Sequence, residues 1–368
     1  MSFTHPTRRT FLAGTAGLAL GSLAAPALAQ SRQQVSLAFG VPSIGGSDLG
    51  FFSSIPKGFG LYEDEGLDVE IVLIGGASAA SNLVYAGQAD FSTHGGGGTI
   101  SAVENGVPIK AFICQIVDNI FSLGVAADSP IQSIADLRGK TIGIASVGGT
   151  PDILAHAIVA QAGLDPNADV EYLAVGLGAP ALDALQRGRI DAMLSFDTSF
   201  ADFEILGQQM RYFRPAPLPS IGFSHVTNAS LDTIENRPEV VTGMARALAR
   251  SLVYMAAADP EELAKLHFSL YPESVPSGVE RTEALRIDRM RFEARKQFMR
   301  FDQRVFQRTE PLGSAAASDI ELLRDLLGLS ADANAPKPAS DYFDASFVEA
   351  MNAIDFEADI ARARAFRA

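Results

Sequence analysis

The residues whose types suit them to hold a small molecule gather in short glycine-rich segments. Glycine lets the backbone approach a ligand, and the free N–H groups of a helix N-terminus favour accepting or negative groups. Ser78, Thr93, Gly149 and Thr150 therefore predict contacts to an anionic or strongly accepting group. The segments are Gly45-Gly46-Ser47-Asp48, Gly76-Ala77-Ser78, Ser92-Thr93-His94-Gly95, Ser146-Val147-Gly148-Gly149-Thr150 and Phe196-Asp197-Thr198.

Three carboxylates extend this pattern, because a buried acid pairs with a cationic or donating part of a ligand. They are Asp48, Asp118 and Asp197, although Asp48 could equally cap a helix. The mixture favours a polar or zwitterionic organic molecule over a simple inorganic anion. Phe51, Phe52, Phe196 and Phe200 supply either flat apolar walls or core packing. The candidate ligand-binding residues are Gly46, Ser47, Ser78, Thr93, His94, Asp118, Ser146, Gly149, Thr150 and Asp197.

A secreted hydrolase is one alternative, because His94-Gly95-Gly96-Gly97-Gly98 resembles the oxyanion segment of esterases. That chemistry also needs a nucleophile elbow of the pattern Gly-x-Ser-x-Gly. Ile144-Ala145-Ser146-Val147-Gly148 lacks its first glycine. The single cysteine, Cys114, excludes an internal disulfide and a Cys-built metal site, and its apolar surroundings predict a buried thiol. We therefore expect no enzyme, no catalytic residue, no metal and no cofactor.

The elements that position these segments form a repeat. Shifting the sequence by 101 positions aligns Gly75 with Gly176, Gly87 with Gly188, and Asp90 with Asp191. Each copy predicts a strand, a glycine-rich turn, a helix ended by glycine, and a second strand. Such units build sheets with helices on their faces, which indicates an α/β fold. The copies cover 68–92 and 170–194.

Further strands are predicted near 35–41, 109–117, 140–145 and 220–227, and helices fill the chain beyond residue 230. Charges alternate along 281–308, which is typical of a solvated helix face. Pro151 suits the first turn of a helix that follows Thr150. The predicted helices are 238–258, 260–270, 281–308, 318–329 and 341–364.

Composition narrows the class of protein. Of the 368 residues 47% are hydrophobic, which is typical of a globular protein. The formal net charge of −14 argues against binding to nucleic acid, because phosphate groups attract positive charge. Arg8-Arg9, the uncharged run from Phe11 to Leu23 and Ala27-Leu28-Ala29 follow the order of a twin-arginine export signal. We expect residues 1–29 to be cleaved, leaving a periplasmic protein that starts at Gln30 and is more acidic still.

Several segments resemble one family in order and spacing across roughly 35–260. The resemblance is to the sulfonate/nitrate/taurine-type solute-binding proteins of ABC importers, a group that includes binders of thiamine-pyrimidine precursors and synthase relatives. Thr198 stands where many members carry proline. The matching segments are Gly60-Leu61-Tyr62, Gly66-Leu67-Asp68-Val69-Glu70, Gly87-Gln88-Ala89-Asp90-Phe91, Asp136-Leu137-Arg138-Gly139-Lys140 and Gly188-Arg189-Ile190-Asp191-Ala192.

This resemblance implies a type II periplasmic binding-protein fold, with two α/β lobes joined by two crossing strands and with C-terminal helices on lobe one. Lobe one would comprise 30–118 plus 222–368, and lobe two 119–221. Ligand would lie in the cleft, and the implied partners are a small organic solute and a membrane permease, with the protein a monomer. The synthase branch is a further alternative, but that branch carries a cysteine-rich segment and this chain has one cysteine.

Overall fold

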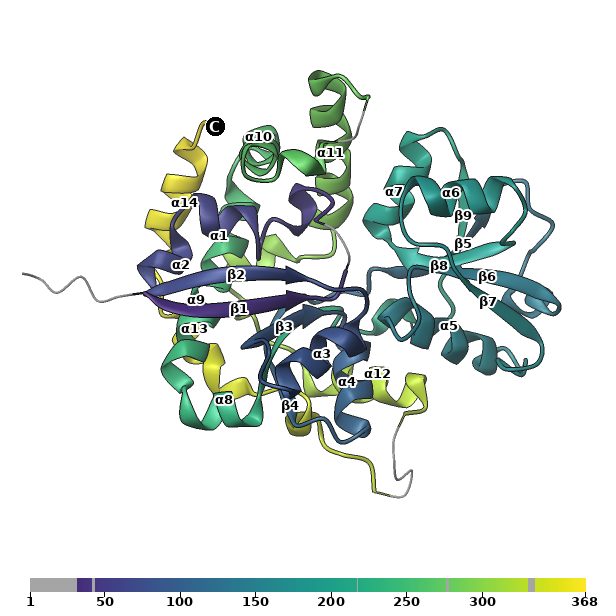
Figure 1. Ribbon diagram of the computed structural model, residues 1–368, viewed down its shortest axis with the longest axis horizontal. Coiled ribbons are helices and arrows are strands. Elements are labelled where there is room, and N and C mark those ends of the chain that lie inside the picture. Colours follow the sequence, from purple (N-terminus) through teal and green to yellow (C-terminus); the bar gives the residue numbers. More distant parts are fainter. Residues whose placement is uncertain (1–31, 42–43, 217, 276–277, 330–334) are drawn as a thin grey trace, which may run out of the picture. The chain divides into compact units, whose positions relative to one another are not determined.

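The repeated unit predicted from the sequence organises the computed structural model, which describes residues 32–41, 44–216, 218–275, 278–329 and 335–368 (Figure 1). The predicted export signal, residues 1–29, lies outside the described residues. The first copy forms β2 (Leu67–Leu73), α3 (Ala77–Tyr85) and β3 (Phe91–His94), and the second forms β7 (Val170–Ala174), α6 (Ala179–Gln186) and β8 (Ala192–Phe196).

The described strands form two five-stranded sheets with equivalent orders, β2-β1-β3-β10-β4 and β7-β6-β8-β5-β9. In each sheet three neighbouring strands are parallel and the last two pairings are antiparallel. We call each sheet with its helices the first lobe and the second lobe. The remaining strands are β1 (Gln33–Phe39), β4 (Ile109–Ile116), β5 (Phe121–Ala126), β6 (Lys140–Ile144), β9 (Met210–Phe213) and β10 (His225–Ser230).

Helices cover both faces of each sheet (Figure 1). The helix α9 (Pro238–Ala257) forms the centre of the first lobe, because Met244, Leu248 and Tyr254 are fully buried. The second lobe is held by α5 (Thr150–Gln161), α6 and α7 (Asp197–Ile205). The other helices are α1 (Ser54–Gly58), α2 (Leu61–Asp64), α4 (Gly96–Glu104), α8 (Leu231–Asn236), α10 (Pro260–Leu270), α11 (Arg281–Lys296), α12 (Ala317–Leu327), α13 (Val348–Asn352) and α14 (Phe356–Ala365).

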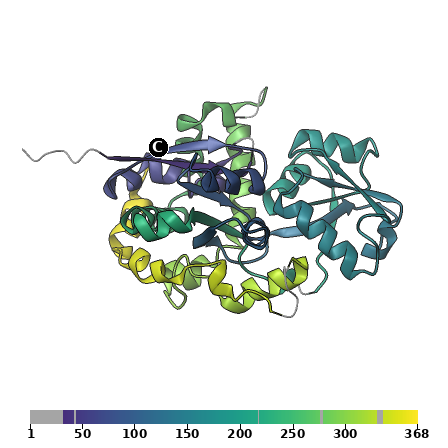
Figure 2. The same cartoon turned by 60° about the horizontal axis from the view of Figure 1, so that its bottom comes forward.

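The C-terminal helices pack on the first lobe, but α11 also packs against α7 of the second lobe. Both α13 and α14 contact α9, and the yellow C-terminal segment runs alongside this lobe in Figure 2. The helix α12 contacts α4 of the first lobe and also α5 of the second. Cys114 is buried and free, and burial raises the pKa of its thiol to about 12, so the prediction of a buried thiol is confirmed.

Three predicted elements were wrong in extent. The strand predicted over 220–227 begins only at His225, because Phe223 adopts a left-handed conformation with φ of 62°. The helix predicted over 281–308 ends at Lys296, and Arg300 and Arg308 have φ of 49° and 55°. Left-handed residues interrupt both hydrogen-bond patterns.

The helix predicted over 341–364 is also interrupted. Asp344 accepts a hydrogen bond from the N–H of Ser346 at 3.0 Å, and Asp355 accepts one from the N–H of Ala358 at 3.0 Å. Such local side-chain bonds compete with a continuous helix and start new ones. The segment therefore divides into two short 3-10 turns followed by α13 and α14.

Candidate functional site

A cavity of about 150 Å³ lies where the carboxyl ends of the parallel strands of both sheets meet. Ligands of α/β proteins bind at this end of the strands, because the turns and helix N-termini that follow expose backbone donors. The first lobe contributes Phe39, Gly40, Gly75, Ala77, His94 and Gly95, and the second contributes Ala145, Ser146, Gly149, Thr150, Gly176, Leu177 and Phe196.

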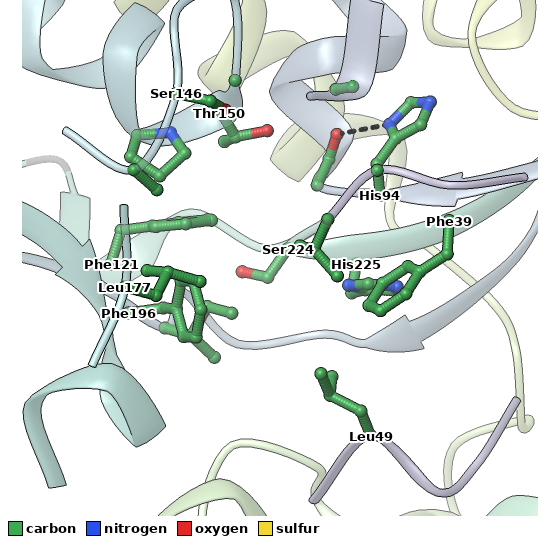
Figure 3. A pocket seen from close by; sticks show the side chains of 18 of the residues that line it. Phe39, Leu49, His94, Phe121, Ser146, Thr150, Leu177, Phe196, Ser224 and His225 are labelled. Carbon is green, nitrogen blue, oxygen red and sulfur yellow. Dashed lines mark hydrogen bonds between the residues drawn. The ribbon is translucent and has the colours of Figure 1, made fainter. Parts of the chain in front are cut away.

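Most of the cavity wall is apolar. Phe121 and Phe196 of the second lobe stand edge to face with ring centroids 6.4 Å apart, and Leu177 lies beside them (Figure 3). Phe39 and Leu49 line the side formed by the first lobe. An apolar cavity of this volume accepts about one benzene-sized ring.

A few hydroxyl groups interrupt this wall. The oxygen of Ser224 points into the cavity, and Ser146 and Thr150 lie at its second-lobe side (Figure 3). Thr150 Oγ1 is buried, and among the described residues no group forms a hydrogen bond with it. An orphaned buried hydroxyl costs free energy unless something fills its place, so Thr150 is the strongest local sign of a polar ligand contact.

His225 enters the cavity from β10 with its protonation fixed by neighbours. Its Nε2 lies 2.9 Å from Thr93 Oγ1, whose own proton is donated to the carbonyl of Val226 at 3.2 Å. Thr93 also accepts a hydrogen bond from Thr227 at 3.1 Å. Nε2 of His225 therefore carries the proton and donates it, which leaves Nδ1 as an acceptor. Burial, with Arg295 nearby, lowers the pKa of His225 well below its usual value, so the ring is neutral.

His94, at the end of β3, is also neutral. Its Nδ1 lies 3.1 Å from the carbonyl of Gly95 and its Nε2 lies 3.0 Å from Ser81 Oγ. Burial lowers the pKa of His94 to about 4. The hydrogen bond to the carbonyl places the proton on Nδ1, so Nε2 accepts from Ser81. Ser81 is itself buried and does not line the cavity, so this pair cannot attack a ligand there.

The run of glycines after His94 has a packing explanation. A Cβ at Gly95 would overlap Thr150, a Cβ at Gly96 would overlap the carbonyl of Phe223, and a Cβ at Gly98 would overlap Ala77. Close backbone approach therefore requires glycine at these positions. The resemblance to an esterase segment arises from this approach. The hydroxyl that lies against Gly95 belongs to Thr150, and no described residue forms a hydrogen bond with it that could activate it as a nucleophile.

Arg295, on α11, is a cavity residue that the sequence analysis missed. Its side chain is 1% exposed, and its Nε and Nη2 donate to the two carboxylate oxygens of Asp197 at 2.8 and 2.7 Å. Nη2 also donates to Thr198 Oγ1 at 3.2 Å and lies 3.9 Å from Asp48. Burial raises the pKa of Asp197, while Arg295 opposes the rise.

The charged residues of α11 are therefore solvated only in part, which corrects the prediction for 281–308: Arg286, Arg289 and Glu293 are exposed, but others turn inward. Asp288 is fully buried and accepts hydrogen bonds from the N–H and hydroxyl of Ser47, the former at 3.0 Å. Burial raises the pKa of Asp288 to about 6. Arg291 pairs with Asp202 of α7. No local motif distinguishes these residues from an ordinary charged helix, because their partners lie in distant segments.

The predicted site residues divide into two groups. His94, Ser146, Gly149 and Thr150 line the cavity, and Thr93 lies one layer behind it against His225. The others do not line the cavity and have protein partners: Gly46 and Ser47 lie against Asp288, Ser78 donates to the carbonyl of Gly148, Asp118 binds Arg300, and Asp197 binds Arg295, which does line the cavity.

For four phenylalanines the sequence leaves open whether they line the cavity or pack in the core. Phe196 lines the cavity, whereas Phe51, Phe52 and Phe200 lie in the core, with Phe51 and Phe52 contacting the His225 ring from behind. Sequence reasoning also missed Phe39, Phe121, Ser224 and His225. Their position directly at strand ends is the signal that could have found them.

Within the described ranges no three His, Cys, Asp or Glu side chains are grouped so that they could hold a metal ion. No helix in the part of the chain described here has the length and apolar character needed to span a bilayer.

Comparison with known families and curated proteins gives a consistent result. A family model described as NMT1/THI5 like matches residues 49–263, which confirms the resemblance found in the motifs. A 4-amino-5-hydroxymethyl-2-methylpyrimidine phosphate synthase of Legionella pneumophila is 24% identical over 223 residues, 60% of this chain and 69% of that protein. A putative thiamine biosynthesis protein of Haemophilus influenzae is 29% identical over 146 residues, but the match spans only 44% of it and 40% of this chain.

Solved structures share the fold at low identity. A protein of Bordetella bronchiseptica RB50 gives a TM-score of 0.69 at 20% identity, covering 87% of this chain and 96% of that one. The alkanesulfonate-binding protein SsuA of Xanthomonas axonopodis pv. citri, bound to MOPS, gives 0.52 at 16%, covering 71% and 83%. A Candida albicans protein described as having the generic periplasmic binding-protein fold gives 0.53 at 14%, covering 87% and 95%. These similarities confirm the predicted type II periplasmic binding-protein fold.

Proposed function

The chain belongs to the NMT1/THI5-like family, and on that premise we propose that it is the substrate-binding subunit of an ABC importer, which holds one small organic solute in the cavity between its lobes. The observation that carries the proposal is the cavity itself. It lies at the strand ends of both sheets, has three phenylalanines in its wall, and contains the orphaned hydroxyl of Thr150. Concave, mostly apolar sites with a few placed polar groups are typical of small-molecule binding.

The cavity favours a planar, single-ring solute within the pyrimidine or aromatic part of the predicted range over a flexible aliphatic sulfonate. Flat rings stack on or stand against Phe121 and Phe196, and about one ring fills the volume. Ser224 and the Nδ1 of His225 supply a donor and an acceptor at the first-lobe side.

The cellular setting is part of the same proposal. Residues 1–29 act as a twin-arginine export signal. The exported part consists of lobe one, 30–118 plus 222–368, and lobe two, 119–221. The protein works in the periplasm as a monomer and delivers its solute to an inner-membrane permease. The fold shared with alkanesulfonate-binding SsuA supports this role.

An enzyme of the pyrimidine phosphate synthase type is the second candidate, because curated relatives carry that name. The cavity gives it little support. No lysine or cysteine occurs among the lining residues, Cys114 is buried elsewhere, and His94, one of the two histidines that reach the cavity, has both ring nitrogens engaged by neighbours. The hydrolase alternative lacks an activated nucleophile, because no described residue forms a hydrogen bond with the Thr150 hydroxyl at the glycine run.

A melting scan against a library of small organic solutes tests the proposal, since a ligand that binds the native state raises the midpoint. We expect a planar monocyclic compound to raise the midpoint and to be recovered unchanged by mass spectrometry after long incubation. Recovery of a chemically altered compound would favour the enzyme. No shift with any solute, for a folded protein, would refute the binding role.

A further inference from the structure

Arg295 is the one Lys, Arg, Asp or Glu side chain among the residues that line the described cavity. It comes from α11, beyond residues 49–263 that match the family model. The ligand-facing charge of this protein is therefore supplied by a segment outside the part that defines the family. What that charge selects depends on the groups that surround it.

Two carboxylates already balance Arg295. Asp197 accepts from Nε and Nη2 at 2.8 and 2.7 Å, and Asp48 lies 3.9 Å from Nη2. All three side chains are nearly inaccessible to solvent, at 1%, 4% and 5% exposure. One guanidinium thus faces two carboxylates, so the cluster has no positive charge to spare for a third negative group. Nη1 makes no hydrogen bond to a described residue, so its N–H groups remain available as donors.

The positive end of the α5 dipole, at Thr150, is also balanced by a carboxylate. Asp152, in the first turn of α5, accepts the N–H of Gly148 at 2.8 Å and places its own negative charge at the positive end of the helix dipole. The other polar groups of the cavity are neutral: the hydroxyls of Ser146, Thr150 and Ser224 and the two histidine rings. They can bond to a ligand without compensating a full charge.

A ligand anion in this cavity would lose its hydration and meet a cluster whose net charge is already negative. Buried anions need a paired cation, and like charges at close range repel strongly in a desolvated site. A neutral acceptor loses far less hydration and still receives hydrogen bonds from Nη1 of Arg295 and from Thr150. Building on the proposed function, we infer that the cavity selects an uncharged planar ring bearing a hydrogen-bond acceptor and rejects the ring of the same shape that carries an anionic group.

Benzamide and benzoate test this inference, because they have the same outline and differ in charge. Titration calorimetry at neutral pH should show benzamide binding to the wild-type protein roughly tenfold or more tightly than benzoate. Asp197→Asn removes one neutralising charge while keeping an oxygen that accepts from Arg295. That variant should bind benzoate roughly tenfold more tightly than wild type does, which narrows or reverses the preference.

The matched control is Asp202→Asn, since Asp202 pairs with Arg291 on the same two helices, α7 and α11, but neither lines the cavity. It should leave the benzamide-to-benzoate ratio unchanged, which separates pocket charge from contact between the helices. If Asp197→Asn fails to fold, the ratio of benzamide to benzoate affinity in the wild-type protein still tests the inference.

Tighter binding of benzoate by the wild type, or an anionic compound as the strongest hit of the solute library, would overturn the inference and leave the binding role intact. If the library yields a ligand while neither ring binds at millimolar concentration, a planar ring is the wrong class. If the library also yields nothing, the proposed function fails together with the inference.

Discussion

The two lobes share one strand order and place different chemistry at equivalent positions. His94 ends β3 and His225 begins β10 in the first lobe, and these strands are paired through Val226 and His94. Phe196 ends β8 and Phe121 begins β5 in the second lobe, where the two phenylalanines are themselves paired. A ring held between the lobes would thus meet hydrogen-bonding rings on one side and apolar rings on the other. Equivalent topology fixes where side chains lie, but it leaves open what they do.

The lobes also differ in how they hold their polar groups. The first lobe surrounds its histidines with neutral partners from its own strands and helices, such as Ser81, Thr93 and Asn228. The second lobe buries a carboxylate, Asp197, at the start of α7 and depends on Arg295 from α11 to balance it. The contrast is therefore between a neutral network in the first lobe and a charge imported from α11 into the second.

Removing the imported charge should have the largest effect. Arg295→Met leaves Asp197 buried without the cation that donates to it, so we expect it to lower the free energy of unfolding by about 3–5 kcal/mol in urea titrations. Arg291→Met is the control, because both partners of its ion pair are 18% exposed and water can solvate what remains. Equal losses in the two variants would contradict the contrast.

A charge partner of this kind could not be predicted from the sequence. Asp197 was expected to face a ligand, yet its partner lies 98 residues further along the chain in a helix of alternating charges. The sequence predicts a helix over 281–308, of which 281–296 is helical, but charged residues are spread around that helix. Only tertiary packing decides that Asp288, Arg291 and Arg295 turn inward.

The repeat, by contrast, was predictable because its signals are local. Gly87 and Gly188 end their helices, and Asp90 and Asp191 each accept a hydrogen bond from the backbone of a neighbouring strand. Asp90 accepts the N–H of Ser36 at 2.8 Å, and Asp191 accepts the N–H of Thr141 at 3.0 Å. Each aspartate thus bonds the backbone of the parallel strand beside it, β1 in the first lobe and β6 in the second.

The neutral network should appear in the pH dependence of stability. Burial lowers the pKa of His94 to about 4, against about 6.5 in the unfolded chain. The unfolded state therefore binds the proton more readily, and stability is complete above about pH 6.5 and falls as the pH drops toward 4, by about 3 kcal/mol. His94→Gln should lack this loss, so its free energy of unfolding should approach or exceed that of wild type in acid.

Phe196→Leu, at the equivalent position of the second lobe, is the control for this measurement. It removes no titrating group, so its cost should be the same at pH 4.5 and pH 7. Unfolding curves at both pH values measure the difference in the free energy of unfolding between each variant and wild type. The titration of His225 and His267 contributes little to these differences, because every variant retains both residues. A pH-independent effect of His94→Gln would show that His94 is not held neutral by its surroundings.

The smallest predicted effect tests whether the lobes are equivalent where the sequence repeats. Gly87 and Gly188 have φ of 68° and 66°, and a Cβ at either would meet open space. In both, the glycine N–H bonds to the carbonyl three residues back, and the next residue's N–H bonds five residues back. Alanine at either site suffers only the cost of the left-handed backbone, so we expect each substitution to destabilise by about 1–2 kcal/mol.

Asparagine tolerates this conformation better than alanine, so Gly87→Asn and Gly188→Asn should each cost less than the alanine variant at the same site. Urea unfolding of the four variants measures the costs. Equal values at the two sites would show that identical helix ends contribute equally in the two lobes, although these lobes present different chemistry to the cavity. A large loss at only one site would mean that packing around that helix end, rather than the shared backbone geometry, determines its cost.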